Sequence, residues 1–253
     1  MPRQEAPRPE RPELTLVFPV CDEVENLGLL IDNALSIAGR LAARFEIVLV
    51  DDGSRDGSGE LIDALCMRDP RIHALRHQSN KGYGAALRSG LREARGELVF
   101  FSDSDLQFDL NELEKLLSYT DQFDIVAGYR SPRQDPWPRR WIASSWGALV
   151  RSLFGLRVRD IDCAFKVFHR RVLEFMPIES IGAFVNTEIL VRAEAAGYRI
   201  HQVPVSHRPR RFGRQSGAHP RVILRALSEL LRLYRELRRA RRVPPAERRC
   251  ASS

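Results

Sequence analysis

Acidic side chains directly follow two apolar segments of this chain. One segment, residues 47–58, reads IVLVDDGSRDGS, and the other, residues 98–107, reads LVFFSDSDLQ. If each apolar run is a buried strand, its acids lie at the carboxyl edge of a sheet, where open α/β sheets bind ligands. Asp103 and Asp105 are two positions apart, so an extended backbone turns both carboxylates toward one hard cation, which prefers oxygen ligands. The pattern favours a nucleotide diphosphate held through a divalent metal ion over acids that only cap the next helix.

Glycine-rich phosphate loops do not occur in the expected places. The sequence contains no GxxxxGK[ST], and no GxGxxG follows the first apolar run. That run continues into FPVCDEVENL, residues 18–27, in which Pro19 ends the strand and Glu23 is placed to reach a ribose or a base. A later segment, NKGYGAALRSG at residues 80–90, opens a helix with two glycines that let the backbone approach a ligand closely. We therefore expect acids and metal, rather than a glycine cradle, to hold the nucleotide.

Alternating strands and helices position these acids. The pattern predicts strands at residues 14–19, 45–51, 72–76, 98–102 and 124–128. It predicts helices at residues 24–41, about 57–67, 83–94 and 110–119, and an amphipathic segment at 139–156. This β-α-β alternation is typical of a mostly parallel α/β sheet with helices on its faces, a fold that by itself decides nothing about function.

Composition limits the class of protein. The chain has 253 residues, of which 43% are hydrophobic, enough for one large domain. Its four cysteines show no CxxC pair and no zinc-finger spacing, which favours a reduced, cytoplasmic chain. Residues 1–13 are rich in Pro, Arg and Glu and are expected to be a disordered leader before a domain at residues 14–217. No run of 18 apolar residues occurs, so no membrane-spanning segment is expected.

The last part of the chain, residues 218–253, is strongly basic. Residues 207–253 hold 14 Arg and 3 Glu, a net charge of +11, whereas the whole chain has +7, so the remainder carries −4. Apolar residues at helical spacing within residues 221–242 predict a basic amphipathic helix followed by a disordered tail. Such a helix either lies on an anionic membrane surface or packs its apolar stripe on the domain. Aromatic residues are scarce here, so we expect no nucleic-acid partner.

Seven motifs in order give the chain a family resemblance. They read PVCDEVENL, VDDGSRDGS, NKGYGAALRSG, DSDLQ, AGYR, RDIDCAFKVFHR and VNTEILVRAEAAGYRIHQVPVSHRPRRFGRQSG, between residues 14 and 217. With them the chain resembles the family 2 glycosyltransferases, and among these the dolichyl-phosphate mannose synthases and polyprenyl-phosphate hexose transferases. The resemblance implies a GT-A (Rossmann-like) fold and an inverting transfer of a sugar from a nucleotide diphosphate.

The resemblance also assigns residues to the donor. It implies contacts to the nucleotide-sugar from Pro19, Glu23, Asp52, Ser104 and Arg210, with Arg210 closing over the pyrophosphate. It implies a Mg²⁺ or Mn²⁺ site formed by Asp103, Asp105 and Gln107. A divalent cation at this place stabilises the negative charge that the leaving nucleotide diphosphate gains.

The charge of the acceptor decides which residues are needed to bind it. A lipid phosphate is already an anion and needs cations to hold it rather than a general base. The resemblance implies that Arg130, Arg140 and Ser144 hold such a phosphate. Glu188 has two interpretations, a structural or acceptor-loop residue or a catalytic base. Asp103, Asp105, Arg130 and Glu188 are therefore the candidate catalytic residues.

Two functions remain open on these residues. The first is transfer of mannose or glucose from a GDP- or UDP-hexose to polyprenyl or dolichyl phosphate, by an enzyme peripheral on the cytoplasmic membrane face. It would meet its lipid through an anionic surface or through a separate membrane-protein partner. The alternative is a family 2 transferase that acts on a glycan or another hydroxyl acceptor in cell-envelope or polysaccharide synthesis.

Overall fold

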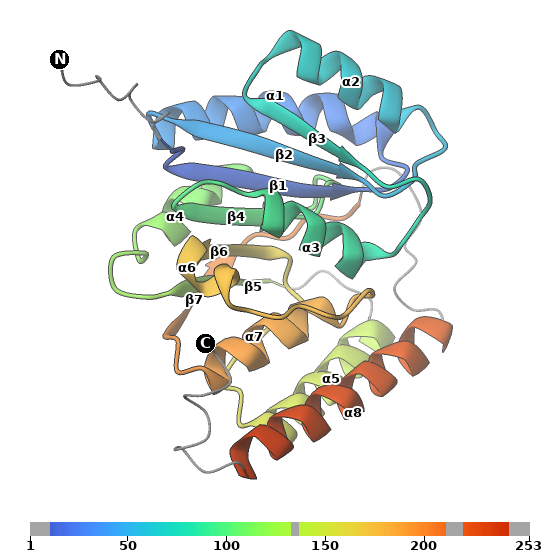
Figure 1. The fold of residues 1–253 in the computed structure, drawn as a ribbon, viewed down its shortest axis with the longest axis vertical. Coiled ribbons are helices and arrows are strands. Elements are labelled where there is room, and N and C mark those ends of the chain that lie inside the picture. Colours follow the sequence, from blue (N-terminus) through green and yellow to red (C-terminus); the bar gives the residue numbers. More distant parts are fainter. Residues whose placement is uncertain (1–10, 133–136, 211–219, 243–253) are drawn as a thin grey trace, which may run out of the picture.

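Seven strands form one sheet in the part of the chain that the computed structural model describes, residues 11–132, 137–210 and 220–242 (Figure 1). The strands are β1 (Leu14–Val20), β2 (Phe45–Asp51), β3 (Ile72–Arg76), β4 (Leu98–Ser102), β5 (Ile125–Arg130), β6 (Phe165–His169) and β7 (Ile200–Val205). Their order across the sheet is β3-β2-β1-β4-β6-β5-β7.

Helices connect and cover the strands. They are α1 (Val24–Leu41), α2 (Ser58–Arg68), α3 (Tyr83–Glu93), the 3₁₀ helix η1 (Leu110–Glu112), α4 (Leu113–Leu117), α5 (Trp137–Phe154), α6 (Arg170–Glu174), α7 (Val185–Ala195) and α8 (Pro220–Arg242). In Figure 1, α3 lies in front of the sheet and α1 lies behind it. The sheet therefore carries helices on both faces, as a doubly wound α/β sheet requires.

The sheet is mostly parallel, as the sequence pattern predicts. β1 pairs in parallel with β2 and β4, β2 with β3, and β5 with β7. β6 runs antiparallel between β4 and β5. The five predicted strands are all present, whereas β6 and β7 are outside the set that the pattern predicts.

The centre of the sheet is buried on both faces. Every residue of β1 and β2 is buried, which explains their nearly continuous apolar sequences. On one face α3 approaches β1 and β2 so closely that a Cβ at Gly90 would lie 2.4 Å from the side chain of Val17. Close approach fixes α3 and the loop before it, residues 77–82, against the ends of these strands.

The ends of the described chain also contact the sheet and its helices. Although residues 1–13 are expected to be disordered, Pro12 O accepts a hydrogen bond from Glu97 N and Glu13 N donates to Arg44 O; residues 1–10 lie outside the described residues. α8 packs on α7, where Arg192 pairs with Glu236 at 2.7 Å. Within the described residues, no helix combines the length and the apolar character needed to cross a bilayer.

Candidate active site

The carboxyl ends of the parallel strands bring the predicted acids to one edge of the sheet. β1 and β2 are in register from Leu14↔Phe45 to Val20↔Asp51, so they end together. β4, parallel to β1, ends at Ser102, just before Asp103. Ser104 Oγ donates a hydrogen bond to Pro19 O at 2.9 Å and thereby joins the ends of β4 and β1. This edge therefore gathers the donor residues that the sequence predicts.

Asp52 is buried at this edge and holds a loop. Its carboxylate accepts backbone N–H groups from Lys81 at 2.9 Å and Gly82 at 2.8 Å, and it contacts His77 Nδ1 at 2.6 Å. Gly53 has a φ of +73°, and a Cβ there would lie 2.6 Å from Asn80 N, so the close approach requires glycine. Asp52, the expected contact to a ribose or base, therefore also holds residues 77–82 in place.

Glu23 and Arg210 meet across the site. Glu23 is buried and accepts from Asn26 Nδ2 at 2.6 Å, and the Arg210 guanidinium hydrogen-bonds its other carboxylate oxygen. Burial raises the pKa of Glu23, and Arg210 opposes that rise. Arg210 Nη1 also lies 3.8 Å from Asp105 Oδ2. The segment after β7 therefore brings a cation to the acids, whereas the contact of Arg210 with a donor pyrophosphate stays a prediction.

Asp103 and Asp105 form an electrostatically unfavourable pair. Burial and the neighbouring charge of Asp105 raise the pKa of Asp103 to about 7. Among the described residues, the buried Asp103 Oδ1 finds no hydrogen-bond partner. Leu106 has a φ of +59°, a left-handed conformation that costs a leucine about 1–3 kcal/mol and that gathers at functional sites. The loop therefore carries backbone strain as well as a buried carboxylate oxygen that has no hydrogen-bond partner among the described residues.

These features fit a divalent cation. A cation would satisfy the orphan oxygen and offset the repulsion between the two carboxylates. No group of three or more His, Cys, Asp and Glu side chains with metal-site geometry occurs in the described part of the chain. Mg²⁺ commonly takes only one or two carboxylates and completes its shell with water and substrate phosphates. Asp103 and Asp105 are therefore suited to an ion that arrives with a phosphorylated ligand.

Gln107, the third expected metal ligand, has a different contact. Its Nε2 donates to Arg208 O at 2.9 Å, and Arg208 N donates back to Gln107 O at 2.8 Å. The two bonds fasten the segment after β7 to the loop after β4. This contact positions the segment that carries Arg210.

Arg130 ends β5 beside a partner that the sequence analysis did not assign. Its Nε and Nη2 donate to the two carboxylate oxygens of Asp160 at 2.7 and 2.8 Å. The side chains are 10% and 6% exposed, so the pair is nearly buried. Ser144 is exposed on α5, and Arg140 belongs to the same helix, but its side chain lies outside the described residues.

Glu188 is buried in α7, and both of its carboxylate oxygens accept hydrogen bonds. It accepts the backbone N–H groups of Glu179 at 3.1 Å and Ser180 at 2.7 Å, and Arg192 Nε at 2.9 Å. Arg192 continues to Glu236 on α8. Of the two interpretations of Glu188, these contacts match the structural one.

Tyr83 and Lys166 also lie near Asp103, although the sequence analysis assigned no role to them. Tyr83, at the start of α3, is close to Asp103, and burial and this neighbour raise its pKa well above the ordinary value. Lys166, in the middle of β6, is fully buried. Tyr83 belongs to the motif NKGYGAALRSG and Lys166 to RDIDCAFKVFHR, but only the fold brings these two residues near Asp103.

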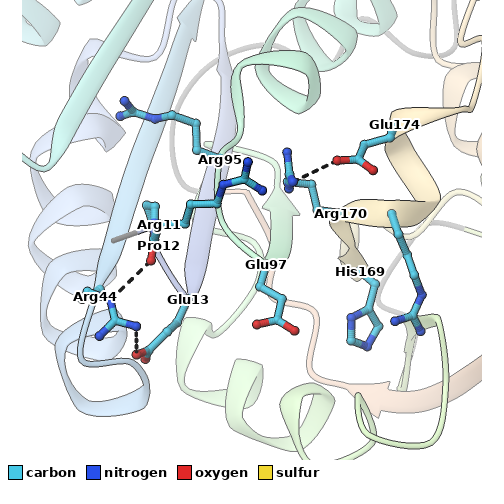
Figure 2. Close-up of a pocket in the computed structure, with 10 residues that line it drawn as sticks. Arg11, Pro12, Glu13, Arg44, Arg95, Glu97, His169, Arg170 and Glu174 are labelled. Atoms are coloured by element: carbon cyan, nitrogen blue, oxygen red, sulfur yellow. Dashed lines mark hydrogen bonds and ion pairs between the residues drawn. The ribbon is translucent and has the colours of Figure 1, made fainter. Parts of the chain in front are cut away.

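A separate pocket lies at the opposite edge of the sheet (Figure 2). It measures about 540 Å³ and lies beside the amino ends of β1 and β4. Arginines line it, and Figure 2 shows Arg44 paired with Glu13 and Arg170 with Glu174. Because the acids at the carboxyl ends of the strands are on the other edge, this pocket is not part of the candidate active site.

Comparisons with known proteins show a family and a shared fold. The family model described as glycosyl transferase family 2 matches residues 15–182. The undecaprenyl-phosphate 4-deoxy-4-formamido-L-arabinose transferase of Pectobacterium atrosepticum is 29% identical over 204 residues, which are 79% of this chain and 61% of that protein. The protein of that name from Pseudomonas aeruginosa is 35% identical over 165 residues, 64% of this chain and 49% of the relative. The chain thus spans about half to three fifths of the length of these relatives.

Solved structures share the fold. Mannosyl-3-phosphoglycerate synthase from Rubrobacter xylanophilus superposes with a TM-score of 0.69 at 20% identity, covering 92% of this chain and 76% of that chain. Glucosyl-3-phosphoglycerate synthase from Mycobacterium tuberculosis, solved with Mn²⁺, UDP and glucosyl-3-phosphoglycerate, gives a TM-score of 0.62 at 20% identity and covers 89% of this chain and 77% of its own. The GT-A fold that the resemblance implies is confirmed.

Proposed function

Because the chain belongs to glycosyl transferase family 2, we propose that it transfers a hexose from a nucleotide diphosphate to a polyprenyl phosphate. The observation that carries the proposal is the pair of carboxylates Asp103 and Asp105 at the ligand-binding edge of the sheet, where burial and the charge of Asp105 raise the pKa of Asp103 to about 7. The printed names of the relatives, undecaprenyl-phosphate sugar transferases, support the lipid acceptor. The donor is a GDP- or UDP-hexose, with mannose or glucose as the sugar.

On the donor side, the chain supplies orientation and charge. Asp103 and Asp105 would hold Mg²⁺ or Mn²⁺, which as a Lewis acid stabilises the leaving diphosphate. Glu23 and Asp52, at the ends of β1 and β2, are the proposed contacts to the nucleoside, beside Pro19 and Ser104. Arg210 would exchange its contact with Asp105 for the donor pyrophosphate, because a guanidinium binds phosphate oxygens bidentately.

On the acceptor side, the charges favour a nucleophile that arrives ionised. A phosphate oxygen attacks the anomeric carbon without losing a proton, so no base is needed. Glu188, the acid considered as a base, is held by two backbone N–H groups and Arg192. Arg130 is oriented by Asp160 at the end of β5 and is the proposed anchor for the acceptor phosphate, with Arg140 and Ser144 on α5. A glycan or other hydroxyl acceptor is the second candidate.

α8 supports a membrane-facing role, because its leucines divide between two faces. Leu230 and Leu233 are each 2% exposed and pack on the domain. Leu224, Leu227 and Leu231 are 67%, 36% and 49% exposed and lie on the outer side together with arginines. An apolar stripe flanked by arginines suits an anionic lipid surface. We therefore propose peripheral binding at the cytoplasmic membrane face, where a membrane-protein partner can also dock.

Transfer can be tested with purified protein, radiolabelled GDP- and UDP-hexoses, Mn²⁺ and polyprenyl phosphate. The expected result is a label that partitions into organic solvent and is released by mild acid, which marks a phosphodiester-linked sugar. Polyprenol, which lacks the phosphate, is the matched control acceptor. Label on polyprenol or on glycan acceptors, with none on polyprenyl phosphate, would reject the proposal in favour of a hydroxyl acceptor.

A further inference from the structure

Lys166 lies at the centre of the sheet with no exposed surface. It stands on β6, opposite Phe101 of β4 and Ala127 of β5. Its Nζ donates to Ile161 O at 3.3 Å, to Cys163 O and to Asn186 Oδ1 at 2.9 Å. An ammonium group has three N–H donors, so these three acceptors use its full capacity.

Such a residue is costly to bury. An ammonium group loses its hydration in a protein interior, and an apolar side chain of similar volume would fill the space without that loss. Burial lowers the pKa of Lys166, whereas Asp160, Asp162 and Asp103 oppose that change. The partners of its N–H groups therefore indicate what the residue does in the fold.

These partners lie in the loop before β6 and at the start of α7. Ile161 and Cys163 belong to the loop that also carries Asp160, and Cys163 N donates to Asp160 O at 3.5 Å. Asp160 in turn receives the guanidinium of Arg130 in a bidentate, nearly buried contact. A continuous series of hydrogen bonds thus runs from Lys166 through the loop to Arg130.

We propose that Lys166 is a positioning residue for the acceptor phosphate: it fixes the loop that carries Asp160, and Asp160 orients the Arg130 guanidinium. This inference rests on the proposed function, because Arg130 is the anchor for the phosphate there. Asp103 is also close enough to act on Lys166 electrostatically, but the hydrogen bonds of Lys166 in the described part of the chain go to Ile161, Cys163 and Asn186, so the main effect is expected on the acceptor. The nucleoside contacts at the ends of β1 and β2 are not among the partners of Lys166.

The test is Lys166→Met, which keeps much of the side-chain volume and removes the three donors. The KM for polyprenyl phosphate is expected to rise about tenfold, equivalent to about 1.4 kcal/mol. The Kd for nucleotide diphosphate in Mn²⁺, measured without acceptor, is expected to stay within about twofold of the wild type. Lys115→Met is the matched control, because Lys115 is 55% exposed and pairs with Glu112 on the surface.

A double-mutant cycle with Asp160→Asn separates positioning from a merely structural role. If both residues act through Arg130, the double variant loses no more acceptor affinity than the worse single variant. Additive losses, or equal losses for donor and acceptor, would overturn the inference. Should Lys166→Met not fold, Asn186→Ala keeps the lysine and removes one of its acceptors, and a smaller, acceptor-selective rise in KM is expected. An unchanged KM in that variant would overturn it too.

The proposed function is judged by a different result. If the wild type gives no transfer to polyprenyl phosphate, the proposed function fails, and the inference falls with it. If the wild type transfers and Lys166→Met keeps the wild-type acceptor KM, only the inference fails.

Discussion

Glu188→Gln separates the structural interpretation of this acid from the catalytic one. The substitution keeps the shape of the side chain but removes its charge and places an NH₂ group among donors. Glu188 is 1% exposed and accepts three hydrogen bonds, from Glu179 N, Ser180 N and Arg192 Nε. At least one of these bonds must become a contact between two donors. We therefore expect a loss of stability with little change in the chemistry.

The size of the loss follows from burial. Breaking a buried ion pair by removing one partner costs about 3–5 kcal/mol. Arg192 keeps its contacts with Glu236 at 2.7 and 2.9 Å, so the lower end, about 3 kcal/mol, is expected. For a chain of this length, 1 kcal/mol corresponds to about 2 °C, so Tm should fall by about 6 °C. The kcat of the folded variant should remain within about threefold of the wild type, because no step of the proposed reaction uses Glu188.

Calorimetry and steady-state transfer assays measure the two effects separately. Glu194→Gln is the matched control, because Glu194 is an exposed acid of the same helix and its replacement should change stability by less than about 0.5 kcal/mol. A general base contributes about 10²–10⁴ to the rate. An unchanged Tm together with a kcat reduced by that factor would refute the structural interpretation and establish Glu188 as the base.

Three further outcomes follow from packing and exposure. Gly84→Ala should lower the free energy of unfolding by about 1–3 kcal/mol, because a Cβ there would lie 2.6 Å from two carbonyl oxygens. At Gly28 a Cβ would have no atom within 4 Å, so Gly28→Ala should stabilise α1 by about 0.5–1 kcal/mol. Thermal unfolding measures both. Leu231→Glu on the outer side of α8 should weaken sedimentation with anionic liposomes at unchanged Tm; undiminished binding would contradict the membrane proposal. Cys163 is buried, and burial raises its pKa to about 12, so the thiolate is scarce at pH 8 and Ellman's reagent should not modify it in the native protein; rapid labelling would contradict its burial.

The sequence predicts the first half of the sheet well because β1, β2 and β4 are largely apolar and the segments between the strands show a clear helical period. β6 is harder, because its sequence FKVFH places a lysine in an apolar run. Hydrogen bonds to the preceding loop, at Ile161 and Cys163, and to Asn186 on α7 make that lysine acceptable in the interior, and the residue pattern of β6 does not show them. Periodicity also carries no information on strand direction. β7 contains Pro204, which argues against a central strand, and the structure resolves this by placing β7 at the edge of the sheet.

Some residues of the candidate site can also be predicted from local sequence, and others cannot. Asp103 and Asp105 are predictable because these acids directly follow an apolar strand in the sequence, which is a local pattern. The partnership of Arg130 with Asp160 joins positions 30 residues apart, and no local pattern indicates it. The apolar residues of α8 form a single stripe in the sequence analysis, whereas burial assigns them to an inner and an outer face. That division depends on how α8 packs against α7.

The most direct test of the account is the affinity for UDP and GDP with and without a divalent cation. Calorimetric titrations of the wild type in Mn²⁺ and in EDTA should show the affinity for at least one nucleotide falling about tenfold or more without metal. In a variant that combines Asp103→Asn with Asp105→Asn, the two conditions should give the same weak affinity. A wild type that binds equally well in EDTA, or a variant that keeps the full effect of Mn²⁺, would contradict the claim that these two aspartates hold the cation.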